Sequence, residues 1–402
     1  MKAIFSKLQK AFTSILAILI IFTIFGCNES ESLVDSVESG YIDSTYDMAS
    51  GGSGTSTGQG SGNSAGLVTA AEWNDLEEWN FWNDLLNENE YNKNIDYWEF
   101  YTNNRISVLV TNNNTLIINA KVELKFNEES IWKCMTDNSG KAELWIGLNS
   151  TENVTSLNDY KLFINDNEIP NSLKLIEDGV VEINLNSSSN NDSNKIELAF
   201  IVDATGSMGD ELEFLKDDLN NVIQRVEQNN TTLDIFTGTV FYRDIFDEYV
   251  VKHSDFTNEI ASTLNFINNQ SAGGGGDYPE AVHTALNEAL NELQWSENSK
   301  TRIAFLLLDA PPHYEPQIID ELHNLVSKSA EKGIKIIPIT ASGIDKETEF
   351  LMRFSAIATN GTYVFITNDS GIGGDHIEAS VGEYQVENLN DLLVRLINKY
   401  SS

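Results

Sequence analysis

Short apolar runs alternate with longer amphipathic stretches through the second half of this chain, and this alternation constrains the fold most. From Lys195 onward, runs that are apolar throughout predict buried strands, and the stretches between them carry apolar residues at helical spacing. The predicted strands are 196–202, 233–242, 303–308, 334–339 and 363–366. Strands without a polar face, separated by helices, are typical of a mostly parallel sheet covered on both faces. We therefore predict an α/β, doubly wound domain at residues 195–402.

A different pattern precedes this region. Between Arg105 and Leu185, apolar and polar residues alternate in several short runs separated by turns, which predicts an all-β sandwich over 105–186. The Ser- and Asn-rich stretch 187–194 reads as a linker. Residues 119–124 and 136–142 resemble the transthyretin-like or carboxypeptidase-regulatory sandwich. That resemblance implies a separate spacer domain.

The N-terminus has the organisation of an export signal. Three lysines in 1–10 are followed by an apolar run over 11–25 that is shorter than the ~20 residues of a spanning helix, which predicts a signal peptide at 1–26. Ile24-Phe25-Gly26-Cys27 resembles the lipobox of bacterial lipoproteins. The resemblance implies that Cys27 carries acyl chains such as palmitate and anchors the protein in the bacterial cell envelope, at the outer membrane or cell surface. An ordinary signal peptide or an uncleaved anchor helix is the alternative.

Two further segments follow the predicted lipidation site. Residues 27–66 are acidic and then rich in Gly and Ser, which is typical of a flexible tether. Residues 67–104 form a segment in which aromatic side chains stand among acids. Such a segment either packs between domains or offers a platform for carbohydrate, and packing is the more general role of aromatic side chains. The remaining cysteine, Cys134, lies in a predicted strand and is expected to be a buried structural thiol.

The net charge of the chain limits the kinds of partner that it is expected to bind. The 402 residues include 61 acids and 25 Lys or Arg, a formal net charge of −36. An acidic surface repels phosphate backbones, so we expect no nucleic-acid partner. Carboxylates are also the ligands preferred by hard cations such as Mg²⁺.

Several oxygen-bearing side chains follow the predicted strands or open the helices of the α/β region. In open sheets of this kind, ligands bind at the carboxyl ends of the strands, where these side chains would meet. Hydroxyl and carboxylate oxygens together suit Mg²⁺, with Mn²⁺ or Ca²⁺ as alternatives. The candidate ligands are Asp203, Thr205, Ser207, Asp277, Glu280 and Asp309.

These motifs resemble those of the von Willebrand factor A, or integrin I-like, family. Asp203-Ala204-Thr205-Gly206-Ser207 corresponds to the family's Asp-x-Ser-x-Ser pattern, with Thr in place of the first Ser, and Asp309 corresponds to the third-loop Asp. The resemblance implies a Rossmann-like fold with a metal-ion-dependent adhesion site. It also implies a protein ligand that offers a carboxylate to the metal, and no enzyme activity. The second-loop ligand is either Asp277 or Glu280.

Other roles remain open for the same residues. Asp277 and Glu280 precede a predicted helix as in a capping box, and Ser207 stands where a helix cap would. A scaffold of an envelope assembly without metal-dependent ligand exchange is the main alternative function. A serine hydrolase built on Ser207, Asp309 and His376 is a remote one, because the turn lacks the first Gly of a nucleophile elbow.

Overall fold

A computed structural model of the chain describes residues 65–402, apart from 152–153, 155, 171–172 and 186–192. The predicted signal peptide, Cys27 and nearly all of the predicted tether lie outside the described residues. Those that are described belong to one compact unit, Ser61–Ser402. Within them, no helix is both long enough and apolar enough to cross a membrane.

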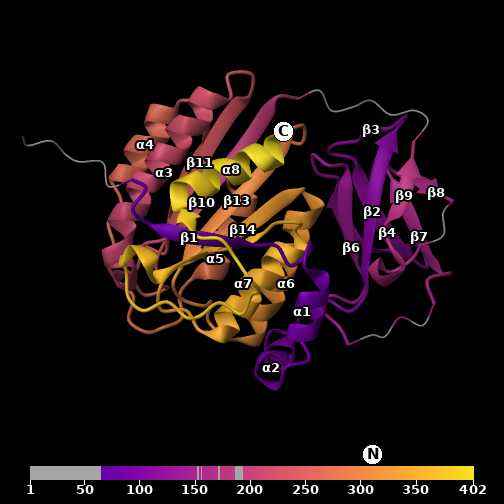
Figure 1. Cartoon of the computed structure of the whole chain (residues 1–402), viewed down its shortest axis with the longest axis horizontal. Helices are drawn as coiled ribbons and strands as arrows, with labels where there is room; N and C mark the ends of the chain where they lie inside the picture. The colour runs from indigo at the N-terminus through magenta and orange to yellow at the C-terminus, as the bar shows by residue number, and fades with distance from the viewer. Residues whose placement is uncertain (1–64, 152–153, 155, 171–172, 186–192) are drawn as a thin grey trace, which may run out of the picture. The chain divides into compact units, whose positions relative to one another are not determined.

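An eight-stranded, mostly parallel sheet forms the centre of the α/β region, as predicted (Figure 1). Its strand order is β12-β11-β10-β13-β14-β15-β1-β16. The parallel strands are β10 (Lys195–Asp203), β11 (Asp234–Tyr242), β13 (Thr301–Leu308), β14 (Ile334–Thr340) and β15 (Tyr363–Ile366). The antiparallel strand β12 (Val251–Thr257) closes one edge. Residues of β10 are buried on both faces, which explains the unbroken apolar run in the sequence.

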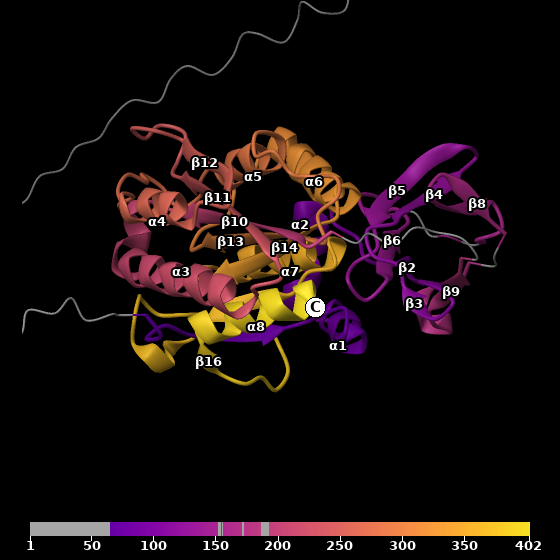
Figure 2. The same ribbon diagram turned by 90° about the horizontal axis from the view of Figure 1, so that it is seen from above.

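Helices cover both faces of this sheet, and Figure 2 shows α3 and α8 on the side opposite α5 and α6. Alternate residues of β10 divide between two hydrophobic clusters: Leu198 and Phe200 face one, and Ala199 and Ile201 face the other. The first cluster takes the apolar sides of α3 (Gly209–Asn229), α4 (Ile260–Asn268) and α8 (Leu389–Ser401). The second takes those of α5 (Val282–Asn291), α6 (Pro316–Glu331) and α7 (Lys346–Ala358).

The aromatic-rich segment extends this sheet beyond the residues from which we predicted it. Strand β1 (Thr69–Trp73) pairs antiparallel with β15 and with the short strand β16 (Glu387–Asn388). Helices α1 (Trp79–Leu85) and α2 (Asn89–Trp98) follow. Trp82 stacks on Phe350 of α7 with ring centroids 5.7 Å apart, and the Phe100 and Phe354 rings are 3.7 Å apart. The rings of Trp82, Trp98 and Phe100 are buried, so they pack the core and offer no platform to carbohydrate.

Between α2 and β10 the chain forms an all-β region of two four-stranded sheets. The first contains β2 (Arg105–Asn112), β3 (Thr115–Leu116), β6 (Lys141–Trp145) and β9 (Val181–Asn184). The second contains β4 (Lys121–Phe126), β5 (Glu129–Met135), β7 (Tyr160–Ile164) and β8 (Asn167–Ile169). Alternate residues of β2 and β4, such as Val108 and Leu124, enter one hydrophobic core. Cys134 on β5 is buried, and burial raises the pKa of its thiol, which keeps it protonated.

A buried ion pair ties the segment after β1 to helix α7. Arg353 is fully buried and its Nε donates to Asp75 Oδ2 over 2.9 Å, while its Nη2 donates to the other carboxylate oxygen. Arg353 also approaches Glu349 of the same helix, with Nη1 and Oε1 3.8 Å apart. Removing one partner of a buried pair leaves the other charge without compensation in a low dielectric.

We therefore expect Asp75→Ala to lower the free energy of unfolding by about 3–5 kcal/mol. Lys133→Ala, which breaks an exposed pair with Glu331, is the control and should cost no more than about 1 kcal/mol. Urea denaturation followed by tryptophan fluorescence measures both. Equal effects of the two substitutions would contradict the role given to the buried pair.

Candidate metal site at the carboxyl ends of the central strands

Adjacent parallel strands bring two of the predicted ligands to the same edge of the sheet. Asp203 is the last residue of β10, and Asp309 directly follows β13, which pairs with β10 up to Val202 and Leu307. Both side chains are buried. Carboxylates at the ends of neighbouring strands are where an open α/β sheet binds its ligands.

The turn after β10 is organised around one oxygen of Asp203. The backbone N–H and the Oγ1 hydroxyl of Thr205 both donate to Asp203 Oδ1, over 2.8 and 2.7 Å. Thr205 Oγ1 also lies 3.1 Å from Ser207 Oγ, and Ser207 is exposed on the short helix η2 (Gly206–Met208). Thr205 Oγ1 therefore links the Ser207 hydroxyl to the Asp203 carboxylate.

The two second-loop candidates differ in burial. Glu280 is 2% exposed, and its backbone N–H donates to the carbonyl of Pro311, two residues after Asp309, over 2.9 Å. Asp277, by contrast, lies on an exposed stretch of the same loop. The backbone contact therefore brings Glu280 to the third loop, while Asp277 stays exposed.

Burial and mutual repulsion perturb the carboxyl groups of this site. Burial, followed by the charge of Asp309, raises the pKa of Asp203 to about 7. Burial and then the charge of Asp203 raise the pKa of Glu280 to about 9. The pKa of Asp309 is also raised by burial. Each group thus resists ionisation in the absence of a compensating positive charge.

Three buried oxygens of the site lack a hydrogen-bond partner within the part of the chain that the structure describes. They are Asp203 Oδ2, Glu280 Oε2 and Asp309 Oδ1. Unpartnered carboxylate oxygens are costly to bury, and oxygens of this kind are ligands for a hard cation. The donor set therefore fits a divalent ion such as Mg²⁺. Over the described ranges, however, no group of three or more His, Cys, Asp or Glu side chains lies close enough together to hold a metal ion.

Glycine is required where the second loop crosses the site. Gly275 has φ +71°, and a Cβ there would lie 2.9 Å from Glu280 Oε1. Gly274 has φ +80°, and a Cβ there would overlap the carboxylate of Asp247. The Gly206 N–H donates to the Gly274 carbonyl over 3.1 Å, which joins this loop to the turn after β10. The glycine run therefore permits close backbone approach.

Residues after β11 support the site and were missed by the sequence analysis. Arg243 Nε donates to the Ala204 carbonyl over 3.1 Å, and its Nη2 donates to the Ser271 carbonyl over 2.8 Å. Asp244 pairs with His313 over 2.7 Å between Oδ1 and Nε2. The available signal was position, because these residues follow the carboxyl end of a predicted strand just as Asp203 does.

The hydrolase alternative finds no support in the contacts of His376. Its Nε2 lies 3.8 Å from Glu211 Oε1 and 3.4 Å from the Ile372 carbonyl. The described residues show no hydrogen bond from His376 to Ser207 or Asp309.

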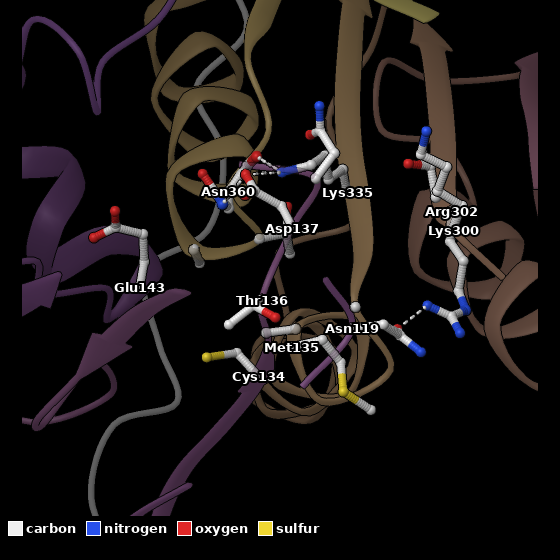
Figure 3. A pocket seen from close by; sticks show the side chains of 16 residues that line it. Asn119, Cys134, Met135, Thr136, Asp137, Glu143, Lys300, Arg302, Lys335 and Asn360 are labelled. Atoms are coloured by element: carbon white, nitrogen blue, oxygen red, sulfur yellow. Dashed lines mark hydrogen bonds and ion pairs between the residues drawn. The ribbon is translucent and has the colours of Figure 1, made fainter. Parts of the chain in front are cut away.

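A separate pocket lies between the all-β region and the amino-terminal ends of the parallel strands, and its polar groups are partnered with one another (Figure 3). Asp137 Oδ2 accepts from Lys335 Nζ over 3.2 Å and from Asn360 Nδ2 over 2.9 Å. Arg302 Nη1 donates to Asn119 Oδ1 over 2.8 Å. These contacts join loops of the all-β region to β13, β14 and the turn after α7, which gives them a structural role.

The solved structures that resemble this chain include two Bacteroides proteins. The protein BatB of Bacteroides thetaiotaomicron is 16% identical, with a TM-score of 0.36, and the match covers 51% of this chain and 98% of that one. An aerotolerance-related membrane protein of Bacteroides fragilis is 15% identical, with a TM-score of 0.34, over 51% of this chain and 99% of its own.

Two curated proteins are similar to part of the sequence. A protein of Acanthamoeba polyphaga mimivirus, described as an ariadne-like RING finger protein, is 29% identical over 191 residues, or 43% of this chain and 19% of its own length. An alpha-protein kinase of Dictyostelium discoideum is 33% identical over 142 residues, 35% of this chain and 22% of its own. This chain thus spans about a fifth of each relative.

Residues 197–376 match the family model of the von Willebrand factor A domain. The match begins within β10 and includes the loops that carry Asp203, Glu280 and Asp309. Sequence pattern, sheet topology and family model agree over this region. The chain therefore contains a von Willebrand factor A domain at residues 197–376.

Proposed function

We propose that the A domain binds a divalent cation, Mg²⁺ in the first instance, and uses it to bind a protein ligand. The observation that carries this proposal is the set of buried, unpartnered oxygens on Asp203, Glu280 and Asp309. Burying three acids together is unfavourable unless a positive charge lies among them, and the raised pKa values of Asp203 and Glu280 express that cost.

Each residue of the site has its own role in this proposal. Asp203, Ser207 and Asp309 would hold the ion, with Thr205 orienting Asp203 and Glu280 adding negative charge. When bound, the cation would supply a Lewis-acidic position for a further carboxylate oxygen. Because hydroxyl ligands are neutral, they leave part of the ion's charge for the partner's carboxylate to compensate. Asp277 stays a solvent-exposed acid outside this set.

A protein ligand fits what is general for this type of domain. Von Willebrand factor A domains generally mediate interactions between proteins and are typically non-catalytic. We accordingly propose a partner that presents a carboxylate, with no nucleic acid and no chemical reaction involved. The acidity of the whole chain, at −36, disfavours phosphate-rich partners.

We further propose that the protein is held in a bacterial cell envelope by lipid on Cys27, at the outer membrane or cell surface. The proposal rests on the charged start, the apolar run and Gly26-Cys27 in the sequence. Several acyl chains, at about 0.8 kcal/mol per buried methylene, give stable anchoring. The Gly- and Ser-rich stretch before residue 65 would then let the A domain bind partners at a distance from the membrane.

One observation favours the scaffold alternative. With pKa values of about 7 and 9, Asp203 and Glu280 can relieve their repulsion by binding protons in place of a cation. The A domain would then hold an assembly together without metal. Binding of the partner that survives EDTA would identify this case.

Isothermal titration with MgCl₂ tests the cation site directly. We expect one site in the wild-type protein and at least about tenfold weaker binding in Asp309→Ala, since a lost charged ligand costs more than 1.4 kcal/mol. Asp277→Asn is the matched control, because it removes one exposed acid from the loop that also carries Glu280. Its affinity should stay within about twofold of wild type. Unchanged binding in Asp309→Ala would refute the site.

The pH dependence of stability gives a second test. A carboxyl group with a higher pKa in the folded protein holds its proton longer when folded, so stability falls as pH rises between the unfolded and folded values. For Asp203 and Glu280 this window runs from about 4 to about 9. In EDTA, we expect the melting temperature to fall as the pH rises through this window. Asp203→Asn should make the melting temperature less dependent on pH. Saturating Mg²⁺ should raise the melting temperature most at high pH, because the ion requires ionised ligands. Calorimetry at several pH values measures this, and a Mg²⁺ effect independent of pH would contradict it.

Lipidation is tested by Cys27→Ser. The variant should move from the membrane fraction to the soluble or unprocessed fraction and should lose incorporation of labelled palmitate. Cys134→Ser, which alters a buried thiol of β5, is the control and should leave both readouts unchanged. Retention of label in Cys27→Ser would show that another residue is acylated.

A further inference from the structure

A large apolar side chain stands almost entirely in solvent beside the candidate cation site. Phe246, in the turn between β11 and β12, is 91% exposed, and the neighbouring Ile245 is also exposed. Exposed apolar side chains of this size carry an unfavourable hydration cost, which contact with a partner would relieve.

The turn that presents Phe246 is held in place. Asp247 Oδ2 accepts from the Asp244 N–H over 3.0 Å, and the Asp247 N–H donates back to the Asp244 carbonyl over 3.2 Å. The same oxygen accepts from the Gly275 N–H over 2.8 Å. Phe246 therefore projects from an ordered turn, which lowers the entropy cost of using it as a contact.

Direct contacts connect this turn to the cation site. Asp247 lies against Gly274 and Gly275, and a Cβ added at Gly275 would lie 2.9 Å from Glu280 Oε1 and 3.3 Å from the Thr205 side chain. On the other side of the glycine run, Tyr278 is 44% exposed while its hydroxyl donates to the Gly343 carbonyl over 3.1 Å. Exposed apolar side chains thus stand on a turn that contacts the glycine run and on the residues that follow it.

Negative charge surrounds the same surface. The Glu248 side chain is 83% exposed, although its Oε2 lies 4.0 Å from Arg243 Nη1, and Asp277 is exposed on the adjacent loop. These acids would repel a partner's carboxylate unless a cation stood at Asp203 and Asp309. They would also attract basic side chains at the margin of the contact.

We propose that this rim selects a segment of another protein in which an acidic residue stands within four positions of a large apolar residue, with basic residues outside the pair. The acid would reach the cation, the apolar side chain would cover Phe246, and the basic residues would face Glu248 and Asp277. An extended segment advances about 3.3 Å per residue, so spacings of one to four cover roughly 3–13 Å. This inference rests on the proposed function.

Surface plasmon resonance with defined peptides tests it. Immobilised 15-residue peptides of Gly and Ser with Lys at both ends carry one Glu, one Leu, or both at spacings of one to four. With the full-length protein in Mg²⁺, we expect at least one Glu-plus-Leu spacing to bind about tenfold tighter than the Glu-only peptide. EDTA should remove the binding of both. Phe246→Ala should reduce the affinity for the Glu-plus-Leu peptide to the affinity for the Glu-only peptide.

Tyr384→Ala is the matched control, since Tyr384 is an aromatic side chain 45% exposed beside Phe365 of β15, several strands away from β11. Tyr384→Ala should leave the affinity for every peptide unchanged. Phe246→Ala should bind Mg²⁺ with wild-type affinity, as measured by calorimetry. Equal binding of the Glu-plus-Leu and Glu-only peptides, or unchanged binding in Phe246→Ala, would overturn this inference alone. Absence of Mg²⁺ binding would overturn the proposed function, and the inference with it.

Discussion

Electrostatic repulsion between buried acids at the ends of β10 and β13 is the constraint around which the A domain is arranged. Two carboxylates about 5 Å apart repel by roughly 3 kcal/mol at an effective dielectric near 20. Parallel pairing of the two strands places Asp203 and Asp309 at one edge and leaves them little freedom to separate. The Thr205 contacts, the glycine run and Arg243 all hold backbone close around these acids. The loops are thus built to keep negative charge together.

The rest of the fold makes that arrangement rigid from the other edge of the sheet. Strand β1 lies between β15 and the edge strand β16, and the aromatic rings after it cover α7. Arg353 connects α7 to Asp75 inside this packed layer. Because packed interiors resist small displacements, strain at one side of the sheet is carried to the strands that bear the site.

Local pattern predicted the parallel sheet and the placement of Asp203, Ser207 and Asp309, because strand periodicity and strand ends are visible in consecutive residues. It could not predict that Thr69–Trp73 pairs with Tyr363–Ile366, since nothing local marks a partner so distant in the chain. Nor could it choose between Asp277 and Glu280. Both stand in one polar loop, and only the fold of that loop buries the second and exposes the first. Asp244 and Asp247 were overlooked because no motif distinguishes them from other turn residues.

The place of β1 in the chain has a mechanical consequence. The all-β region is inserted after β1 and returns to the sheet at β10, so it does not stand between the N-terminal segment and the A domain. If the protein is held through Cys27 and pulled through a bound partner, tension enters at β1 and crosses the sheet through β15, β14 and β13. The all-β region lies outside that path. The hydrogen bonds that join β1 to β15 and β16 would then carry load in such a complex.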